Sequence, residues 1–416
     1  MKKIILFLFC FVISGLFAGK LQSIIDRADP GSKIVLPVGV FKGTIHITKP
    51  LILEGQGKGT VIDGEDKSSI INIDASNVTI RNLTVRNSGH QRYRLDSAIV
   101  VNNVNYVTIE KCNLENILFG IVLTNTQKSI IKGNIITSYQ ESVVDNRGDG
   151  IRLWRSHYNM IANNSLKYGR DLSLTRSNHN VIDANRITNG RYGVLIQMCK
   201  DVKVLNSVIH SNYVGILSRG SKDVLIDHNL VVKTHLATGT GMMLVGGKNI
   251  HVQNNSIMKH AQAFYIDSKA KERKMQRFID HNVIALNNEA FHFHVLIRNN
   301  TIQYNNIYGN LFDVVKDIHS TPTVHNKVTF NYWDQYQGFD KDRNGIGDTP
   351  YQVLVYADKL WQFDPHLKFF YATPLLSIVN FIEKIAPFSE PLLLLEDSRP
   401  AREPFKATGA LFKNFK

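Results

Sequence analysis

The chain has 416 residues and a formal net charge of +14, with 43% hydrophobic and 20% charged residues. This length exceeds what one compact core holds, unless that core is elongated. The cysteines exclude a disulfide-rich scaffold, because only Cys112 and Cys199 lie outside the N-terminal apolar run. The positive charge indicates an acidic partner or an anionic membrane surface.

The N-terminus, MKKIILFLFCFVISGLFAGK, has two lysines, a short apolar run and small residues near Ala18. This pattern predicts an export signal at residues 1–18, cleaved after Ala18, rather than a membrane span. Removing Lys2 and Lys3 lowers the formal charge from +14 to +12. We expect no nucleic-acid partner, because nucleic acid is scarce outside the cytoplasm.

The next segment, LQSIIDRADPG at residues 21–31, predicts a short amphipathic helix ended by Pro30 and Gly31. Strands begin directly after it, in SKIVLPVGVFKG. A helix at this place would cap the open edge of the first strands.

A pattern of aliphatic residues around one turn residue then recurs ten times. Ile or Val stands three residues before each turn residue, and Leu, Ile or Val stands two residues after it. The turn residues are Leu83, Cys112, Asn134, Asn164, Asn185, Ser207, Asn229, Asn255, Asn282 and Asn300. Most are spaced 21 to 30 residues apart, in the range of a solenoid repeat. We expect asparagine here because it tolerates a left-handed backbone and because stacked amides can hydrogen-bond.

A further strand lies upstream of these turns, with aliphatic pairs at alternate positions. The pairs are Ile99 and Val101, Ile121 and Leu123, Ile151 and Leu153, Leu172 and Leu174, Val194 and Ile196, and Met242 and Leu244. A period of two indicates strands and argues against helical repeats. One coil cannot bury its apolar side alone, but stacked coils can. We therefore predict an all-β fold, a right-handed parallel β-helix of about ten coils, over residues 19–330.

Residues 331–372 break the repeat and form a predicted capping segment rich in Asp and Gly. Four oxygen-bearing residues stand at offsets 1, 3, 5 and 9 of a calcium loop: Asp340, Asp342, Asn344 and Asp348. Gly345 occupies offset 6, but Tyr351 stands where the loop has its bidentate Glu. The segment predicts a calcium site, with a glycine turn held by side-chain hydrogen bonds as the alternative.

Residues 373–416 predict an amphipathic helix followed by a basic tail. One helical face carries Leu375, Ile378, Val379, Ile382 and Ile385, and Pro387 ends the run. The helix is too short to span a bilayer. It either docks on a membrane protein or lipid surface, or it covers the open end of the last coil. The tail cations are Arg399, Arg402, Lys406, Lys413 and Lys416, which attract anionic lipid or are simply solvated.

Five side chains are candidate copper ligands, because copper prefers thioether, thiol and imidazole groups. Met198 and Cys199 end a strand, and Met243 should face outward beside an inward Met242. The stretch FHFH places His292 and His294 on one strand face. Core methionines and solvated histidines are the alternative interpretation.

Parallel β-helices also include polysaccharide lyases and hydrolases, and glycoside hydrolysis needs two carboxylates at a fixed separation. Asp149 in RGDGIRLW and Asp171 in YGRDLSL, on adjacent coils, are the best pair. Asp commonly bonds backbone at such turns, so we expect no catalytic residue and no enzyme. A polysaccharide lyase or hydrolase, or a carbohydrate-binding solenoid, is the alternative function. The chain has no phosphate loop, so we expect it to bind no ATP.

The segments GDGIRLW, GRDLSL and RYGVLI on successive coils, followed by NYWDQYQGFDKDRNGIGDTPY and IAPFSEP…DSRP, resemble the NosD family. Its members are periplasmic β-helical maturation proteins for nitrous oxide reductase, and the resemblance extends to about residue 400. Many relatives carry an aromatic- and methionine-rich strand after RYG or RFG. Here that strand reads VLIQMC, and its methionine, Met198, is displaced by one residue.

The resemblance implies a role with an ABC transporter, beside a permease and an ATPase at the inner membrane. It implies that the complex supplies copper to nitrous oxide reductase, with a copper-chaperone lipoprotein as a further partner. The implied role of this chain is a scaffold and relay in the periplasm, without catalysis.

Overall fold

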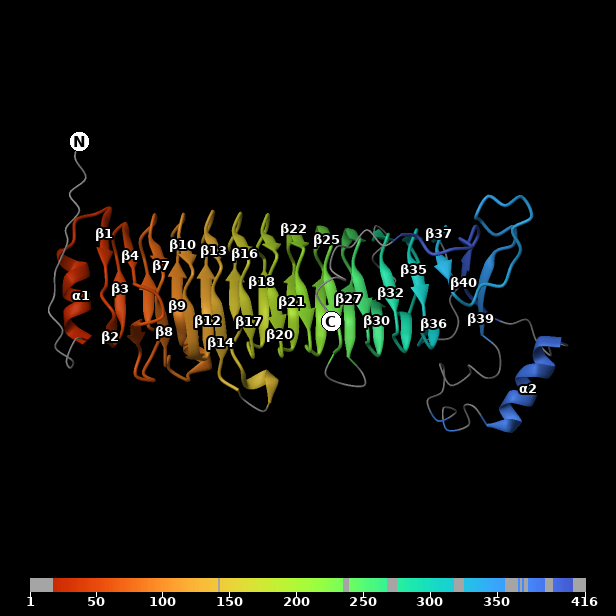
Figure 1. Cartoon of the computed structure of the whole chain (residues 1–416), viewed down its shortest axis with the longest axis horizontal. Helices are drawn as coiled ribbons and strands as arrows, with labels where there is room; N and C mark the ends of the chain where they lie inside the picture. Colours follow the sequence, from red (N-terminus) through yellow and green to blue (C-terminus); the bar gives the residue numbers. More distant parts are fainter. Residues whose placement is uncertain are drawn as a thin grey trace. The chain divides into compact units, whose positions relative to one another are not determined.

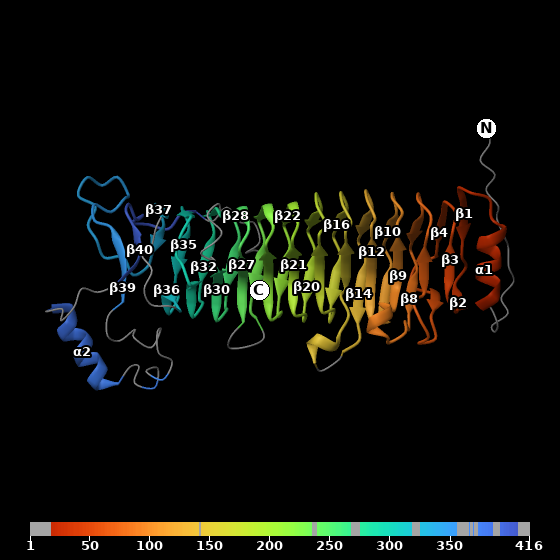
Figure 2. The ribbon, with the colours of Figure 1, turned by 180° about the vertical axis from the view of Figure 1, so that it is seen from behind.

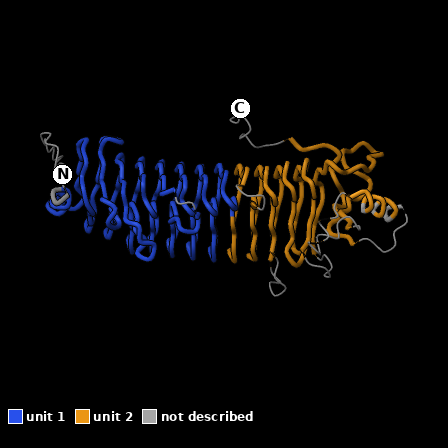
Figure 3. Tube along the Cα trace, turned by 90° about the horizontal axis from the view of Figure 1, so that it is seen from below, with its two compact units in different colours: residues 1–216 blue, residues 217–416 orange. Residues whose placement is uncertain are grey.

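The computed structural model describes residues 18–140, 143–234, 239–267, 275–317, 325–355, 366, 369, 373–385 and 392–406. The predicted export signal therefore lies outside the described residues, except Ala18, and so do the tail lysines Lys413 and Lys416. The chain forms two compact units, residues 1–216 and residues 217–416 (Figure 3).

Unit 1 begins with helix α1 (Ala18–Arg27), which covers the first strands as the sequence predicts (Figure 1). Its Leu21 and Ile25 are each 1% exposed. Gln22 fixes the helix to the sheet, because its Nε2 donates to His46 O at 3.0 Å and its Oε1 accepts from His46 N at 2.8 Å. The helix thus shields apolar side chains and backbone groups of the first coil.

Each coil of unit 1 contributes one strand to each of three parallel ladders (Figures 1 and 2). The first ladder holds β1 (Ser32–Val35), β4 (Leu51–Glu54), β7 (Thr79–Arg81), β10 (Thr108–Glu110), β13 (Ile130–Lys132), β16 (Met160–Ala162), β19 (Val181–Asp183) and β22 (Lys200–Leu205). The second holds β2 (Gly39–Lys42), β5 (Thr60–Asp63), β8 (Thr84–Arg86), β11 (Asn113–Ile117), β14 (Ile135–Ser138), β17 (Ser165–Lys167), β20 (Arg186–Thr188) and β23 (Val208–His210). The third holds β3 (Ile45–Ile47), β6 (Ile71–Ile73), β9 (Ser97–Asn102), β12 (Phe119–Thr124), β15 (Ile151–Trp154), β18 (Asp171–Thr175) and β21 (Tyr192–Gln197). Short 3-10 turns, η1 (Arg92–Arg94) and η2 (Val144–Asn146), lie in its longer loops.

Unit 2 repeats the same three ladders, and β24 (Val214–Arg219) spans the division between the units. Its first ladder holds β25 (Lys222–Asp227), β28 (Lys248–Gln253), β31 (Arg277–Asp280), β34 (Asn300–Gln303) and β37 (Lys327–Thr329). Its second holds β26 (Leu230–Val232), β29 (Ser256–Met258), β32 (Val283–Ala285), β35 (Asn306–Tyr308) and β38 (Tyr332–Trp333). Its third holds β27 (Thr240–Val245), β30 (Gln262–Asp267), β33 (Glu289–His294) and β36 (Phe312–Lys316).

The predicted all-β parallel β-helix is therefore confirmed, but the count of coils differs. Strands of the first ladder occur thirteen times among the described residues, instead of about ten. The two N-terminal coils escaped the sequence pattern because their turns, residues 36–38 and 55–59, are three and five residues long, whereas the recurring turns have two residues. The last coil, ending at Trp333, lies beyond the point where the pattern was followed.

The aliphatic residues before the turns stack in register, for example Ile80, Ile109, Ile131 and Ile161 on successive coils. The prediction of Asn300 as the tenth turn residue is wrong. Ile302 pairs with Ile279, which places Asn305 rather than Asn300 in the turn column. Both asparagines have Ile three residues before and two after them, so the sequence offsets alone could not separate them.

The turn amides form hydrogen-bonded columns, as stacked amides should. In unit 2, Asn255 N and Nδ2 both donate to Asn282 Oδ1, at 2.9 and 3.0 Å. The column runs through Asn229, Asn255, Asn282, Asn305 and Asn331. The left-handed backbone, however, belongs to the residue before each amide, such as Asn254 with φ 54°. Hydrogen bonding, and not left-handed conformation, therefore explains asparagine at these turns.

A hairpin of β39 (Tyr351–Val355) and β40 (Leu392–Asp397) closes the last coil of unit 2. Asp397 Oδ2 ends the amide column, accepting from Asn331 Nδ2 at 2.8 Å and from Trp333 Nε1 at 3.0 Å. Arg399 O and Ser398 N then bond the coil backbone, at Phe330 N and Val328 O. Strand β40 therefore provides the C-terminal cap.

Helix α2 (Pro374–Ile385) lies in the chain between β39 and β40. Its Leu375, Ile378, Phe381 and Ile382 are 72, 58, 63 and 42% exposed. The alternative that this helix covers the last coil with its apolar face is therefore wrong. Across the part of the chain that the structure describes, we find no helix with the length and apolarity needed to cross a membrane.

Candidate functional site

The outer face of the third ladder in unit 2 gathers three of the predicted copper ligands. Met243 pairs in register with Tyr265, and Tyr265 pairs with His292. Met243 lies outward because its neighbours Met242 and Leu244 are fully buried. Since adjacent strands are about 4.8 Å apart, the three side chains form one row across the sheet.

A second row lies two residues further along the same strands. Here Asp267 pairs with His294, so this row adds a carboxylate and an imidazole to the face. The rings of Tyr265 and His294 stack with their centroids 6.0 Å apart. Met243 and His294 stand on strands two steps apart, with Tyr265 between them, so they do not share one metal ion directly.

His292 is held between two carboxylates at the centre of this face. Its Nδ1 donates to Glu289 Oε2 at 2.7 Å and its Nε2 donates to Asp317 Oδ1 at 2.8 Å. Burial disfavours the charged ring, but these hydrogen bonds and charges outweigh burial and raise the pKa of His292 to about 9. His292 is thus a charged donor near neutral pH, with both nitrogens occupied.

His294 has a different arrangement, because among the described residues only its Nδ1 is bonded to a carboxylate. This nitrogen donates to Asp317 Oδ2 at 2.7 Å, which fixes the tautomer and directs Nε2 away from the carboxylate. Since both nitrogens of His292 are bonded to carboxylates, His294 is the imidazole of this face that can act as a metal ligand.

Tyr265, in the first row, is a neutral phenol. Burial raises the pKa of Tyr265, aided by the charges of Asp317 and Asp267.

Asp267 contributes an unsatisfied acceptor to the same face. Its Oδ1 is buried and makes no hydrogen bond to the rest of the described chain. A buried oxygen without a partner is costly, and a cation beside it would remove that cost. Asp267 and His294 give a carboxylate and an imidazole in one place, and Met243 gives a separate thioether. Imidazole and thioether groups suit copper better than magnesium or calcium.

In unit 1, the side chain of Met198 faces solvent and that of Cys199 faces the interior of the β-helix. Met198 is 54% exposed, whereas Cys199 is 3% exposed. The Sγ of Cys199 accepts from Ser177 N at 3.4 Å, and burial raises the pKa of its thiol to about 11. The two residues are not brought together, and Cys199 is a buried neutral thiol rather than an accessible thiolate.

The predicted calcium loop has its side chains directed toward its own backbone. Asp340 Oδ1 accepts from Asn344 N at 3.1 Å and Asp340 Oδ2 from Gly345 N at 2.9 Å. Asp348 Oδ2 accepts from Lys341 N at 2.7 Å. Within the described residues, no group of three His, Cys, Asp or Glu side chains is disposed to hold a metal ion. Calcium binding at Asp340, Asp342, Asn344 and Asp348 stays a prediction.

The acid pair Asp149 and Asp171 lies under a layer of arginines. Both side chains are at most 2% exposed. Arg170 Nη2 lies 2.9 Å from Asp149 Oδ1, and Arg191 Nη2 lies 2.6 Å from Asp171 Oδ2. Burial raises the pKa of Asp171 and its bonds to Arg191 oppose that effect. Buried, arginine-paired carboxylates stabilise the turn between coils and are poorly placed to meet a glycan.

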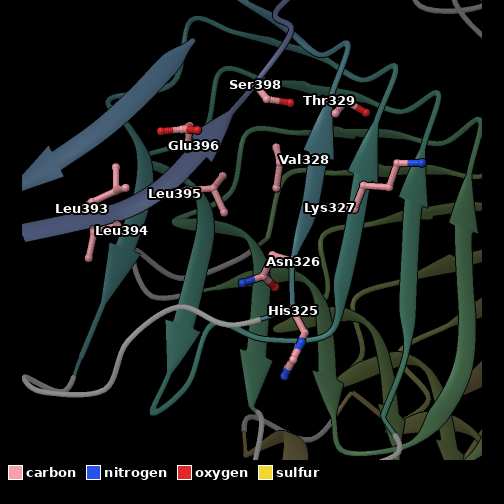
Figure 4. Close-up of a pocket in the computed structure, with 10 residues that line it drawn as sticks. All are labelled: His325, Asn326, Lys327, Val328, Thr329, Leu393, Leu394, Leu395, Glu396 and Ser398. Carbon is pink, nitrogen blue, oxygen red and sulfur yellow. The ribbon is translucent and has the colours of Figure 1, made fainter.

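A groove in unit 2 lies beside the C-terminal cap, between β37 and β40 (Figure 4). Its lining residues are His325, Asn326, Lys327, Val328, Thr329, Leu393, Leu394, Leu395, Glu396 and Ser398. None of the residues predicted from the sequence as metal ligands or catalytic groups lines it.

The sequence prediction missed Tyr265, Asp267, Glu289 and Asp317. A signal for the first two was present, because QAFYID and EAFHFH share their Ala-Phe pair and align without a gap. That alignment places Tyr265 opposite His292 and Asp267 opposite His294, as the structure does. The same alignment does not point to Glu289 or Asp317. Glu289 stands opposite Gln262, and Asp317 directly follows β36.

Comparisons with known protein sequences all find similarity to NosD proteins. A family model described as "Periplasmic copper-binding protein (NosD)" matches residues 137–338. A Pseudomonas aeruginosa protein described as "Probable ABC transporter binding protein NosD" is 23% identical over 413 residues, covering 91% of either chain. A protein of the same description from Stutzerimonas stutzeri is 23% identical over 379 residues, covering 85% of this chain and 83% of that protein.

Among solved structures, the A-module of mannuronan C-5 epimerase AlgE6 from Azotobacter vinelandii is similar with a TM-score of 0.63 and 16% identity. It covers 74% of this chain and 93% of that module. The A-module of AlgE4 from the same organism has a TM-score of 0.58 and 15% identity, covering 75% and 95%. At these identities the similarity shows the parallel β-helix and nothing of its chemistry.

Proposed function

Because the chain belongs to the NosD family, we propose that it is the periplasmic subunit of an ABC transporter complex and hands copper to nitrous oxide reductase. The observation that carries the proposal is the row Met243, Tyr265 and His292 with His294 beside it, on one outer face of unit 2. A carrier that must release its metal needs few ligands, and thioether and imidazole groups bind copper without a closed cage.

Met243 and His294 are the proposed copper ligands of this face, each at a separate binding position. His292 serves them as a positioning residue, because it holds Asp317, and Asp317 orients the ring of His294. Asp267 supplies a negative oxygen near His294 that favours a cation. Exposed Met198 in unit 1 is a further proposed copper ligand. Cys199 is not proposed as a ligand, because its thiol is buried and neutral.

The proposed partners follow from the same family membership. The permease and ATPase of the transporter would supply ATP hydrolysis, since this chain has no phosphate loop. We propose that the exposed apolar face of α2 binds the permease at the inner membrane, because four large apolar side chains there meet solvent. A copper-chaperone lipoprotein is the proposed donor. We propose a scaffold and relay rather than an enzyme, and the buried Asp149 and Asp171 support this choice.

Copper titration of the mature protein tests the proposal. Under anaerobic reduction, Cu(I) is titrated against a competing chelator with wild type, with Met243→Leu/His294→Ala, and with Met258→Leu/His251→Ala as matched control. Met258 and His251 lie on β29 and β28, in the other two ladders of the same unit. We expect the dissociation constant to rise at least about tenfold only in the first variant, since a lost ligand removes about 1.4 kcal/mol or more. Equal binding by both variants, or no binding by wild type, would reject this site.

A further inference from the structure

Unit 1 exposes large apolar side chains where its third ladder turns into its first. Tyr106, Ile130, Tyr158, Met160 and Met198 are 50, 40, 53, 42 and 54% exposed. Scattered apolar residues are ordinary on a protein surface, but a contiguous group indicates an interaction site.

Backbone register places them on neighbouring coils. Lys128 stacks above Tyr106 in the same turn column, with Nζ 3.2 Å from the phenol oxygen and 5.5 Å from the ring centroid. Tyr158 is the next member of this column, and its ring stacks on His179 at 4.5 Å. Ile130 and Met160 follow this turn and pair in register on β13 and β16. Tyr106, Ile130, Tyr158 and Met160 therefore lie on three successive coils spaced about 4.8 Å apart, whereas Met198 lies two coils beyond Met160, in the turn after β21.

The same stretch is rich in exposed cations. They are Lys111, Lys128, Lys132, Arg155, Arg176, Lys200 and Lys203. The acids nearby are fewer: Asp201, bonded to His179 at 2.8 Å, Glu110, 3.6 Å from Arg81, and Asp183, which accepts from Asn206 Nδ2 at 2.9 Å. Positive charge therefore prevails around the apolar residues, in agreement with a chain of net charge +14.

We propose that the four neighbouring apolar residues and the seven cations, together the basic face, dock a folded protein through an acidic surface. Protein interfaces have an apolar centre enriched in aromatic residues and Met with a polar rim. The tyrosines and Met160 of the basic face fit such a centre, and its lysines and arginines fit the rim. The apolar side chains sit on paired strands and tight turns, so they cannot enter a bilayer as a free amphipathic helix does. A polyanion would use the cations but would gain little from Ile130 and Met160.

The inference rests on the proposed function for the identity of the partner. If copper passes from this chain to nitrous oxide reductase, the basic face is where the reductase docks, with Met198 two residues before Lys200 of that face. Electrostatic attraction of this kind raises association rates and weakens with salt.

Binding of the purified reductase to the full mature chain tests the inference. The charge variant is Lys132→Glu/Lys203→Glu, and the matched control is Lys58→Glu/Lys167→Glu, exposed lysines of unit 1 outside the basic face. An apolar variant, Ile130→Thr/Met160→Thr, keeps the charge and a strand-compatible residue. Circular dichroism and urea unfolding verify that all variants fold. We expect both variants of the basic face to weaken binding at least tenfold, and the control to change it less than twofold.

The other outcomes separate this inference from the proposed function. Equal binding by wild type and both variants would overturn the docking face and leave copper delivery intact. Absence of binding by wild type would overturn it too, and would also remove the acceptor from the proposed function. Binding of wild type to phosphatidylglycerol vesicles, lost in the charge variant, would assign the face to lipid instead. Loss through the charge variant with no effect of the apolar variant would indicate a polyanion and would also overturn it.

Discussion

Single amide side chains hold consecutive coils together in this protein. Asn282 accepts two hydrogen bonds from Asn255 and donates to Val252 O and Asn305 Oδ1, at 2.8 and 3.0 Å. All of these groups are buried, so each lost bond leaves a polar atom without water. The column therefore gives both stability and register to the stack.

Replacing Asn282 with Ala should lower the free energy of unfolding of unit 2 by about 3 kcal/mol, because buried donors lose their acceptor. The exposed Asn288→Ala, in the same unit, should change it by less than about 0.5 kcal/mol. Urea unfolding followed by circular dichroism measures both. A cost for Asn282→Ala no larger than that of the control would show that the column contributes nothing to stability.

The clamp around His292 should make stability depend on pH. The pKa of about 9 in the folded state lies above the ordinary value of 6.5, so the folded chain binds this proton more tightly than the unfolded chain. The stabilisation is complete below pH 6.5 and is lost as the pH rises through 9. Wild type should therefore lose stability over this window, and His292→Gln should lose less. A similar loss in both, with exposed His281→Gln as reference, would contradict the clamp.

Individual residues could be placed from the sequence only where the sequence repeats. The buried aliphatic positions could be predicted because ten copies repeat them. The partners of His292 could not, because Glu289 and Asp317 are reached through the fold and not through a repeated offset. Cys199 was taken for a ligand because residue type alone does not reveal that its thiol points inward.

Among the elements, α2 and β40 have separate tasks although they follow one another in the chain. Strand β40 pairs with β39 and supplies Asp397 to the amide column. Helix α2 exposes its apolar residues instead. The sequence suggested one C-terminal segment from residue 373 onward, because an apolar run such as LLLL has no period that separates strand from helix.

Deleting only residues 374–385, with a flexible linker in their place, should abolish binding to membranes that hold the permease. Urea unfolding of the coils should stay unchanged, because α2 keeps its apolar residues outside the core. Truncation after residue 372 should instead destabilise unit 2, because it removes β40 and Asp397. Membrane sedimentation and unfolding curves measure these effects. Undiminished sedimentation of the internal deletion would remove α2 from docking.

The loop at residues 340–348 gives a prediction for calcium. Backbone N–H groups, such as Gly345 N, bond Asp340 and hold its pKa below the usual range despite some desolvation. An ionised carboxylate in a turn of this kind is ready to bind a hard cation. Millimolar calcium should raise the melting temperature of wild type by a few degrees, and magnesium should do so less. An equal response of Asp340→Ala/Asp342→Ala would show that the loop binds no calcium.

For the whole molecule, the fold was the most predictable property and the site the least. Stacked coils follow from short-range periodicity, whereas the copper face needs the register between strands that are about twenty-five residues apart. The side chains proposed for copper lie outside the core, where the repeat imposes no residue type. Function must therefore come from the outer faces, and the parallel β-helix by itself fits enzymes and carriers equally.

Copper delivery by this chain can be measured in the copper content of nitrous oxide reductase. The reductase is purified from cells that lack this chain, from cells with wild type restored, and from cells with Met243→Leu/His294→Ala. We predict a reductase that is copper-poor without the chain, fully loaded with wild type, and poorly loaded with the double variant at equal protein levels. A fully loaded reductase in cells without the chain would contradict copper delivery by this protein.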